Sequence, residues 1–474
     1  MPENGNVYGE DATTRLPESM REVCLHIADL VRKNNGCAYL VGGCVRDAMA
    51  GITPKDVDME IYGIEAQRLL DLVESCYAVD LVGRAFGVLK LKNYSIDLSL
   101  PRREYKQGSG HRGFHVESDP HMTFEEASKR RDFTFNAMGW DILSGEIIDP
   151  HHGQSDFSCG ILRHTSPQFS EDPLRVLRAM QFIARFSLRP ATETVQLCRE
   201  LGQNELPKER LFEEWKKLLC KGVAIRDGIE FLRQVNWIRH YPELMALVDC
   251  EQDPVWHPEG DVFTHTCLCL DAFARERIGD EWEDLIVGLA VLCHDMGKPE
   301  TSFTDEDGHI RSPAHDRVGV PIARRFLERI TAHKELIESV LPLVKEHMQP
   351  LALYRENPSD AAIRRLATRV GRIDRLVRVD RSDRNGRGNY FAEPSPQGAW
   401  LSERAHALTV QDAQPRPILK GRHLIEQALE PGPHFKPILD AAFEAQNEGE
   451  FHEEEGARQW LKTYLLERKN NAKN

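Results

Sequence analysis

The sequence predicts an α+β domain at its N-terminal end, followed by domains made of helices. Residues 37–100 alternate between short segments with strand periodicity and segments with helical periodicity, whereas only helical patterns follow residue 160. The chain has 474 residues, and single hydrophobic cores stop growing near about 250–300 residues. We therefore expect roughly two to four domains.

The elements of the first domain are predicted in chain order. Residues 17–34 have the spacing of an amphipathic helix. A strand ends before Gly42, a helix begins by Val45, and a second strand covers 55–61. Beyond these we expect a helix over 65–76, strands over 78–83, 86–92 and 94–100, a basic Gly-rich loop over 101–116, a helix over 123–139 opened by a Thr123–Glu126 capping box, and a strand pair closing near 153.

The later elements and the domain limits follow from the same patterns. Helices are expected over 171–186, 192–202, 208–221 and 226–238. The chain then divides into an N-terminal tail and helix (1–35), a head (36–155), a helical neck and body (156–250), a histidine-rich domain (256–390) and a helical tail (391–474). The sequence does not indicate an oligomeric state.

Composition excludes several classes of protein. The formal net charge of −14 argues against a general polyanion binder, although local basic segments still allow a nucleic-acid enzyme. There is no apolar run of eighteen residues, so no membrane span is expected. The eleven cysteines lack CxxC spacing, and the first residues lack the order of a signal peptide. We therefore expect a reducing, cytoplasmic location.

The stretch from Leu40 to Gly63 carries the first chemical pattern. Gly42 and Gly43 let the backbone approach a bulky anion, and a helix start beyond them would direct N–H groups toward it. Asp56 and Asp58 are two residues apart in a predicted strand, so both side chains point the same way. Paired carboxylates suit a divalent metal, and a phosphate cradle beside them suits nucleotidyl transfer.

Five ordered motifs resemble one family. GGCVRDAMAG, KDVDMEIYG, KRRDFTFNAM, IIDPHHG and EDPLRVLRAMQFIARF are similar to segments of the bacterial-type CCA-adding tRNA nucleotidyltransferases, of the class II, polymerase-beta-like superfamily. The resemblance implies an α+β head of polymerase-beta type followed by a helical neck, body, HD domain and tail. It also implies tRNA, CTP and ATP as partners, with no membrane.

The resemblance assigns roles to residues of the head. Asp56 and Asp58 would hold two Mg²⁺ ions, and Asp97 is the candidate for a third carboxylate. Gly42, Gly43 and Arg46 would contact the incoming triphosphate. The positions that match the family's RRDxxxNA motif and would place sugar and phosphates are Arg131, Asp132 and Asn136.

The EDPLR segment implies nucleotide selection without a nucleic-acid template. Asp172 and Arg175 are three residues apart in a predicted helix, hence on one face. A carboxylate accepts from the amino group of cytosine or adenine, and a guanidinium donates to a ring nitrogen or carbonyl. Arg178 matches the family, whereas Gln181 stands where many members have a third arginine. Arg210 and Glu214 resemble the motif that braces this helix.

The histidine-rich region resembles an HD phosphohydrolase domain. His294 and Asp295 end an apolar helix, His265 precedes it in VFTHTCLCL, and Asp383 follows in DRNGRG. The resemblance implies that these four hold a divalent transition metal that activates water. His315 and His347 would add a second metal, and the alternative is a domain that only supports tRNA.

Other functions stay open at this point. Within the class, the chain could be a poly(A) polymerase or a partial enzyme that adds only CC or only A. From another class, it could be a metal-dependent HD phosphohydrolase with a nucleotide-sensing head, or a non-catalytic RNA-binding module. Basic residues at 101–113, 129–131 and 361–388 are expected to meet RNA phosphates, the alternative for the last segment being a solvated basic helix.

Overall fold

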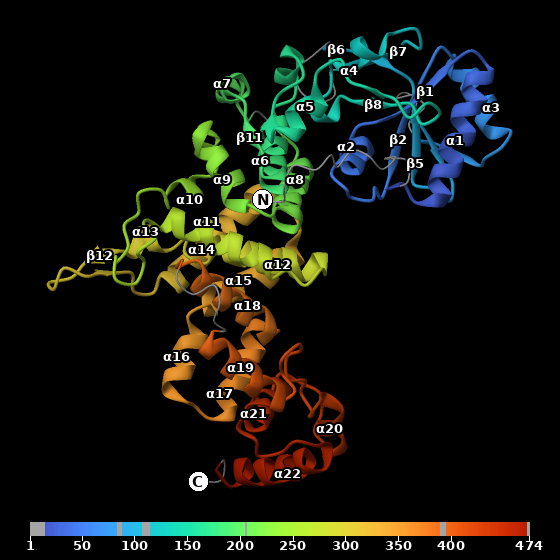
Figure 1. The fold of residues 1–474 in the computed structure, drawn as a ribbon. Coiled ribbons are helices and arrows are strands. Elements are labelled where there is room, and N and C mark those ends of the chain that lie inside the picture. Colours follow the sequence, from blue (N-terminus) through green and yellow to red (C-terminus); the bar gives the residue numbers. More distant parts are fainter. Residues whose placement is uncertain (1–14, 83–87, 107–113, 204–205, 389–394, 472–474) are drawn as a thin grey trace. The chain divides into compact units, whose positions relative to one another are not determined.

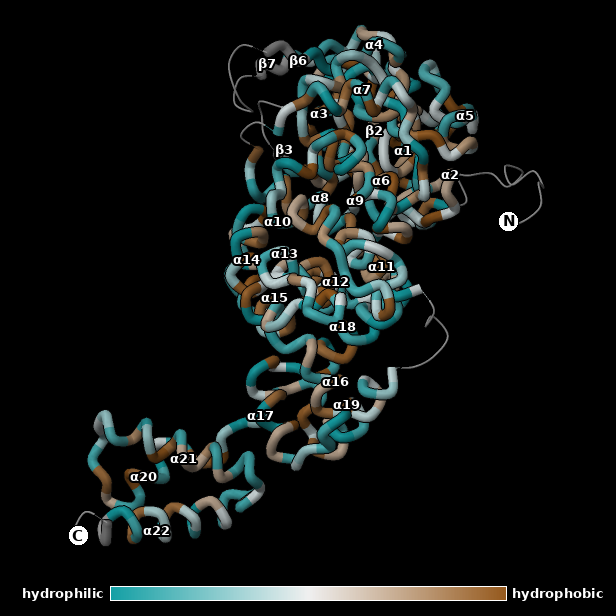
Figure 2. Tube along the Cα trace, turned by 90° about the vertical axis from the view of Figure 1, so that its left-hand side faces the viewer, coloured by the Kyte–Doolittle hydropathy of each residue, from teal (hydrophilic) through white to brown (hydrophobic). Residues whose placement is uncertain are grey.

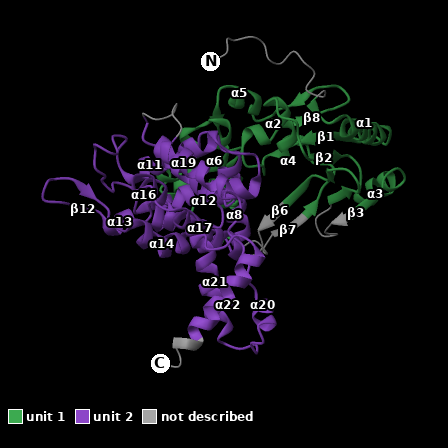
Figure 3. Ribbon diagram, turned by 90° about the horizontal axis from the view of Figure 1, so that it is seen from below, with its two compact units in different colours: residues 1–207, 231–237 green, residues 208–230, 238–474 purple. Residues whose placement is uncertain are grey.

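The computed structural model describes residues 15–82, 88–106, 114–203, 206–388 and 395–471. It consists of two compact units, one formed by residues 1–207 with 231–237 and one by 208–230 with 238–474 (Figure 3). The division falls at the start of a helix, Lys208–Lys221, inside the predicted neck and body.

The first unit contains the mixed sheet predicted for the head (Figure 1). Its strand order is β3-β4-β5-β2-β1-β8-β9, in which β2 and β5 are parallel and all other neighbours are antiparallel. Helix α1 packs on β1 and β2, which places its buried face against the sheet. The bounds are α1 Glu18–Lys33, β1 Cys37–Val41, α2 Gly43–Met49, β2 Val57–Tyr62, α3 Ala66–Glu74, β3 Val79–Val82, β4 Val88–Leu91, β5 Ile96–Ser99, β8 Gly139–Trp140 and β9 Ile147–Ile148.

The predicted strand over 55–61 needs two corrections. Strand β2 begins at Val57, so Asp56 lies in the bend just before it. Asp58 is exposed as expected, but Glu60 on the same face is fully buried. Glu60 is buried because Arg130 and Arg131 supply the positive charge that a carboxylate needs away from water. Simple alternation misses such a pair, since its partners lie seventy residues away in the chain.

The segment 101–116 is not simply a loop. Strands β6 (Arg102–Lys106) and β7 (Phe114–Ser118) form an antiparallel pair, while the rest of the predicted loop, 107–113, lies outside the described residues. Backbone pairing in register from Arg102↔Ser118 to Lys106↔Phe114 forms this ladder without any apolar alternation. The prediction of a loop took the lack of apolar alternation as its signal, and it was therefore wrong at both ends of the segment.

The helix predicted over 123–139 is much shorter. The Thr123–Glu126 capping box is confirmed, and α4 covers Phe124–Ser128. The chain then passes through a short 3-10 helix, η3 (Thr134–Asn136), into β8. The apolar run after α4 is buried on all sides, so its composition indicates burial and not helical periodicity.

The rest of the first unit is mainly helical. Helix α6 begins at Leu174, three residues later than predicted, because Asp172 is extended and Pro173 caps the helix. The 3-10 helix η4 precedes it, and β10 and β11 form a short parallel pair. The bounds are α5 Gly153–Ser158, β10 Ile161–Leu162, η4 Pro167–Glu171, α6 Leu174–Phe186, β11 Arg189–Pro190 and α7 Thr192–Glu200.

The second unit is helical apart from the hairpin β12–β13 (Phe303–Thr304 and Ile310–Arg311). Helix α12 is its centre, with every residue from Glu283 to Cys293 buried, and it appears brown among the surrounding helices in Figure 2. The bounds are α8 Lys208–Lys221, α9 Ile225–Gln234 (shared between the units), η5 Trp237–His240 (which begins in the first unit), α10 Pro242–Met245, α11 Val262–Arg275, α12 Glu281–Cys293, α13 Lys298–Thr301, α14 His315–Ile330, α15 Lys334–Glu346, α16 Gln349–Glu356, α17 Asp360–Val370, α18 Ile373–Asn385, α19 Pro396–Ala407, α20 Gly421–Glu426, α21 Phe435–Glu448 and α22 Glu454–Asn471.

The arginine-rich segment 361–388 is neither a solvated helix nor a free basic surface. Seven of its nine arginines form ion pairs with carboxylates of the same unit, and the side chains of Arg375 and Arg378 are only 13% and 11% exposed. Their partners Glu283 and Asp284 lie in the first turn of α12. Arg372, Arg375 and Arg378 therefore join the start of α18 to α12, and the ion pairs of the segment argue against our expectation that it meets RNA phosphates.

Two findings concern the cysteines and the helices of the described residues. All eleven cysteines are free thiols. None of the helices described is long and apolar enough to cross a membrane.

Candidate functional site

Three carboxylates lie together on, or directly before, the central strands of the head. Asp58 on β2 is in register with Asp97 on the parallel strand β5, and neighbouring strands are about 4.8 Å apart with paired residues on one face. Although the Asp58 side chain reaches solvent, reduced hydration among the surrounding groups of the head raises the pKa of its carboxyl. The negative charges of Asp56 and Asp97 raise this pKa further, whereas Arg131 opposes them. The carboxylate cluster of Asp56, Asp58 and Asp97 thus concentrates oxygen ligands and negative charge, which suits a hard divalent cation.

Gly42 lies directly beside this cluster. Its φ of +75° suits glycine, and a Cβ atom here would lie 3.0 Å from Arg131 Nη1 and 3.9 Å from Asp58 Oδ2. Any side chain at this position would enter the space between the guanidinium and the carboxylate. Gly43 follows as the first residue of α2. The glycine pair therefore keeps open a gap next to one cation and the carboxylate cluster.

Glu60 holds the arginines behind the cluster, a role that the sequence did not indicate. Its carboxylate lies 2.7 Å from Arg130 Nη2 and 3.6 Å from Arg131 Nη2, and Tyr62 donates its hydroxyl at 2.7 Å. Burial raises the pKa of Glu60, but the two arginines outweigh burial and hold that pKa below its ordinary value. The carboxylate therefore stays charged and fixes Arg131.

The remaining head residues form one chain of hydrogen bonds. Arg46 Nη1 donates to Asn136 Oδ1 at 2.7 Å, and Asn136 Nδ2 donates to Asp132 Oδ1 at 2.9 Å. Arg178 Nε donates to Asp132 Oδ2 at 2.7 Å. Burial raises the pKa of Asp132, whereas Arg178 and Asn136 lower it more strongly. These hydrogen bonds connect α2, η3 and α6.

Arg46 belongs more to this framework than to an open surface. Its side chain is only 6% exposed, it pairs with Asp47, and its guanidinium lies over the Phe182 ring at 4.9 Å. Asp47 is also paired with Arg185 of α6 at 3.3 Å, another contact that the sequence did not indicate. The predicted contact of Arg46 with a triphosphate stays a prediction.

The residues predicted to select the nucleotide lie at the start of α6. Asp172 is not on the helix: its Oδ1 accepts from Leu174 N at 3.1 Å, as in a turn. Arg175 donates to the backbone carbonyls of Gln168 and Arg130, and burial lowers the pKa of its guanidinium. Arg175 is thereby attached to the segment that carries Arg131. The departure from the family, Gln181, is buried, and its Oε1 lacks a hydrogen-bond partner in the described part of the chain.

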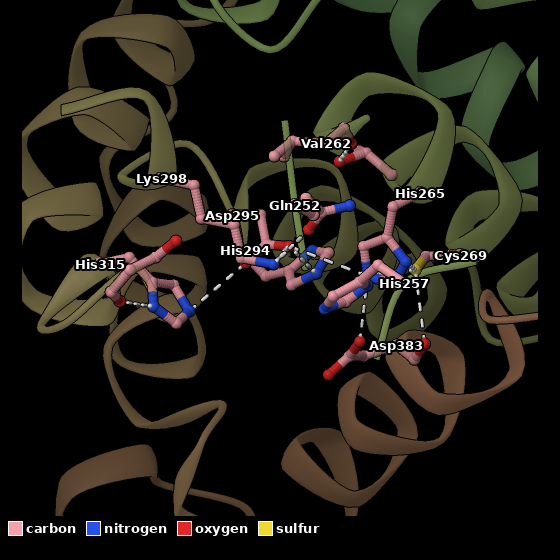
Figure 4. A network of polar contacts seen from close by, with 12 residues as sticks. Gln252, His257, Val262, His265, Cys269, His294, Asp295, Lys298, His315 and Asp383 are labelled. Atoms are coloured by element: carbon pink, nitrogen blue, oxygen red, sulfur yellow. Dashed lines mark hydrogen bonds and ion pairs between the residues drawn. The ribbon is translucent and has the colours of Figure 1, made fainter. Parts of the chain in front are cut away.

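The second unit contains a buried cluster of imidazoles and carboxylates from helices α11, α14 and α18 and from the turns after α12 and α15 (Figure 4). Asp295 is its centre, lying 3.2 Å from His294 Nε2, 3.4 Å from His315 Nε2 and 3.8 Å from His265 Nε2. The histidine cluster consists of the predicted residues His265, His294, Asp295, His315, His347 and Asp383.

Hydrogen bonds orient the rings so that each Nε2 faces the cluster. The Nδ1 atoms of His294, His315 and His347 lie 2.7 Å from the backbone carbonyls of Val291, Ser312 and Val344, respectively. His265 Nδ1 lies 2.6 Å from Glu259 Oε1. A ring that donates from Nδ1 in its neutral form carries a lone pair at Nε2. This is how proteins orient histidines that bind metals.

Two of the resulting contacts need a cation. The Nε2 atoms of His315 and His347 are 3.1 Å apart, and His265 Nε2 is 3.0 Å from Asp383 Oδ1. When the Nδ1 atoms of His265, His315 and His347 donate, each of the two contacts joins two electron-pair acceptors. Burial and the neighbouring His294 lower the pKa of His347 to about 4, so this ring is neutral at physiological pH. A divalent metal fits the donor set on both sides of Asp295.

The charges around the cluster are arranged to keep its carboxylates ionised. Burial raises the pKa of Asp295, but His294 and Lys298 hold that pKa well below its ordinary value, and Lys298 Nζ is 2.7 Å away. Arg387 lies 3.1 Å from Asp383 Oδ1 and has the same effect on its pKa. Four contacts were missed in the sequence, those of Glu259, Cys269, Lys298 and Arg387. For three of them the sequence offered a signal, a spacing of three or four residues from a predicted ligand. Cys269 follows His265 by four residues, Arg387 follows Asp383 by four, and Lys298 follows Asp295 by three.

Comparison with known proteins finds two family models that match parts of the chain. Residues 38–163 match the family described as the poly A polymerase head domain, and residues 262–379 match the HD domain family. A relative called multifunctional CCA protein, from Xylella fastidiosa strain 9a5c, is 35% identical over 392 residues, which is 79% of this chain and 89% of the relative. The protein of that name from strain M23 is likewise 35% identical over 390 residues.

Solved structures show the same fold along almost the whole chain. The Bacillus stearothermophilus CCA-adding enzyme in complex with CTP has a TM-score of 0.63 at 21% identity, and the alignment covers 96% of this chain and 100% of that one. The Thermotoga maritima CCA-adding enzyme complexed with tRNA has a TM-score of 0.58 at 18% identity, covering 96% and 98%. The α+β head with a mostly helical remainder is therefore confirmed.

Proposed function

The chain belongs to the family of multifunctional CCA proteins, and we propose that it adds the nucleotides C, C and A to the 3′ end of tRNA. As a tRNA nucleotidyltransferase it would use CTP and ATP and release pyrophosphate, without a nucleic-acid template. The observation that carries this proposal is the carboxylate cluster beside Gly42 and Arg131, in a head that is connected to α6 through Asp132. A cytoplasmic location follows from the substrate.

The head residues divide the work of binding and orientation. Asp56 and Asp58, with Asp97 beside them, would hold two Mg²⁺ ions, which supply Lewis-acid stabilisation of the triphosphate and of the attacking 3′-hydroxyl. Arg131 lies next to the gap at Gly42 and would offer its guanidinium to a phosphate oxygen. Glu60 fixes that arginine before the nucleotide arrives, so little reorganisation is needed in the transition state.

Asp172 and Arg175 would read the base. In this role, the Asp172 carboxylate accepts from the amino group of cytosine or adenine and disfavours the carbonyl of uracil or guanine. Arg175 is positioned by two backbone carbonyls. Arg178 is held by Asp132 and so connects base reading to the triphosphate site.

The test is a set of tRNA acceptors. Purified protein with Mg²⁺ is incubated with tRNA that lacks CCA, ends in C, or ends in CC, together with labelled CTP or ATP. We expect CTP to be used on the first two acceptors and ATP on the third. Incorporation of AMP in long runs would favour a poly(A) polymerase, and use of only one nucleotide would indicate a partial enzyme. No incorporation into any acceptor contradicts the proposal.

A second function, phosphohydrolysis by the HD domain, is favoured by a cavity. A space of about 350 Å³ borders the histidine cluster at His347 and Asp383, and Trp256, Arg384 and Arg387 also line it. An aromatic ring and arginines beside a metal site suit an aromatic phosphate ester. We propose phosphatase or cyclic phosphodiesterase activity here, with a divalent transition metal that activates water.

The test of the HD function uses the wild type and a His294→Ala/Asp295→Ala variant. Both are assayed on phosphomonoesters and 2′,3′-cyclic nucleotides in the presence of transition metals. We expect hydrolysis by the wild type and none by the variant. Equal hydrolysis by both proteins would assign the activity to a contaminant and refute the proposal.

A further inference from the structure

One sulfur atom, that of Cys269, lies directly beside residues of the histidine cluster. Cys269 follows His265 by four residues on α11, so both side chains lie on one face of that helix. Its Sγ atom is 3.3 Å from His265 Nε2 (Figure 4), and ligand atoms of Cys269, His265, His294 and Asp383 all lie within 4.8 Å of one another. The thiol thus lies among the candidate ligands and not behind them.

The surrounding backbone makes room for this thiol. Gly386, at the end of α18, packs directly against Cys269, and a Cβ atom at Gly386 would collide with Sγ. Cys269 Sγ also lies 3.7 Å from the backbone oxygen of Asp383. The close approach of α18 therefore brings Asp383 and the sulfur to the same point, and only glycine at position 386 permits it.

A second, independent observation points to a ligand at this place. His294 is 1% exposed, and its Nε2 atom has no hydrogen-bond partner among the described residues. The other ring nitrogen, Nδ1, is engaged by the Val291 carbonyl. This nitrogen faces the Asp295 carboxylate at 3.2 Å without a hydrogen bond of good geometry, and it belongs to the same four-residue group as the thiol, which suits a metal ligand.

We propose that Cys269 is a thiolate ligand of the metal in the histidine cluster, alongside His265, His294 and Asp383. This rests on the proposed metal site of the HD domain. A set of two imidazoles, one thiolate and one carboxylate selects a thiophilic divalent cation such as Zn²⁺ or Co²⁺ over Mg²⁺ or Mn²⁺. Formation of the metal–sulfur bond releases the thiol proton to solvent.

Cobalt spectroscopy on the full chain tests this. One equivalent of Co²⁺ is added to metal-free protein in excess Mg²⁺, which occupies the oxygen ligands of the head. Visible ligand-field bands report that Co²⁺ is bound, and a near-ultraviolet sulfur-to-cobalt charge-transfer band reports a thiolate ligand. The variants are Cys269→Ala and, as a matched control, Cys267→Ala, a buried cysteine of the same helix that belongs to no group of potential metal ligands among the described residues.

We expect the charge-transfer band in the wild type and in Cys267→Ala, and its complete loss in Cys269→Ala with the ligand-field bands kept. The affinity of Cys269→Ala for Zn²⁺ should fall about tenfold or more. If the wild type shows ligand-field bands without charge transfer, or if Cys269→Ala keeps the charge-transfer band, the thiolate proposal is wrong and the metal site stands. If the wild type binds no Co²⁺, the metal site itself is refuted. Should Cys269→Ala fail to fold, the wild-type spectrum still decides.

Discussion

The two proposed metal sites of this chain differ in the kind of ligand and in how exposed the ligands are. In the head, the proposed ligands are carboxylates on or just before neighbouring strands, and the Asp97 side chain, which pairs with Lys90 at 2.9 Å, is 33% exposed. In the HD domain, most ligands are imidazoles at helix ends, and His265, His294 and Asp295 are between 0% and 2% exposed. Open oxygen ligands suit a hydrated, exchangeable Mg²⁺ that arrives with a triphosphate, whereas buried nitrogen ligands suit a resident transition metal.

The difference extends to how each site controls charge. In the head, reduced hydration raises the pKa of Asp58, and the nearby carboxylates Asp56 and Asp97 raise it further against the effect of Arg131. The histidine cluster instead places Lys298 and Arg387 beside its carboxylates. Cations of the protein therefore lower the pKa of Asp295 and Asp383 in the HD domain, whereas the pKa of Asp58 in the head stays raised.

The largest expected effect is on nucleotide transfer. Asp58→Ala removes the central ligand of the carboxylate cluster and should lower incorporation of CTP and ATP by about 10³-fold or more, since metal stabilisation amounts to several kcal/mol. Phosphate-ester hydrolysis by the HD domain should not change. The control is Asp80→Asn, whose side chain is 61% exposed. Retention of most transfer activity by Asp58→Ala would break the comparison at its first site.

Metal exchange should separate the two sites next. After chelation, Mg²⁺ should restore nucleotide transfer, while phosphate-ester hydrolysis should stay roughly 10- to 100-fold lower until a transition metal is added. The measurement is the two activities of one preparation after each addition. Recovery of both activities with Mg²⁺ alone would contradict the assigned difference in ligand chemistry.

A smaller effect concerns nucleotide choice. Arg175→Ala should reduce discrimination of CTP and ATP against UTP and GTP by roughly 10- to 100-fold, because one good base contact is worth about 1–3 kcal/mol. Competition between labelled nucleotides on a tRNA acceptor measures this ratio. A uniform loss of all four nucleotides would show that Arg175 only supports the fold through Gln168 and Arg130.

The smallest expected effect concerns stability, at Asp380, a buried carboxylate near the histidine cluster. Burial raises its pKa from 3.8 to about 6, although Ser395 and Gln397 donate to it. A raised folded-state pKa stabilises the protein at low pH, and this contribution is lost as the pH rises through about 6. Between pH 4 and 7.5 the wild type should therefore lose roughly 2 kcal/mol of stability that Asp380→Asn does not lose.

Urea unfolding of both proteins across this pH range measures the difference. Parallel curves for the wild type and Asp380→Asn would mean that the Ser395 and Gln397 hydrogen bonds already compensate for burial. Asp383, three residues later on the same helix, has the opposite shift because Arg387 is beside it. The pair thus shows, within one helix, what a neighbouring cation contributes.

Much of the first site could be predicted from sequence because its ligands are local. Asp56, Asp58, Gly42 and Gly43 lie within twenty residues, and strand periodicity and glycine placement carry the information. The burial of Glu60 and the shortened helix after Ser128 could not be predicted this way. Both depend on contacts between segments far apart in the chain, Glu60 with Arg130 and β8 with β1.

The basic segment 361–388 shows the same limit in the second unit. The positive charge of the segment was visible in the sequence, but its partners were not. These partners include Glu283, Asp284 and Glu276, which lie on or next to other helices. Composition gives the number of charges in a segment. Only packing decides whether those charges meet each other or a partner.

The sequence by itself determined the kind of chemistry, the order of the domains and the identity of the histidines and aspartates. The tertiary structure alone decided which atoms meet: Asp97 beside Asp58, the four Nε2 atoms around Asp295, and the sulfur of Cys269 among them. The physical reason is that residue types and local periods are written along the chain. Distances between helices and strands arise only when distant segments bury their apolar faces against each other.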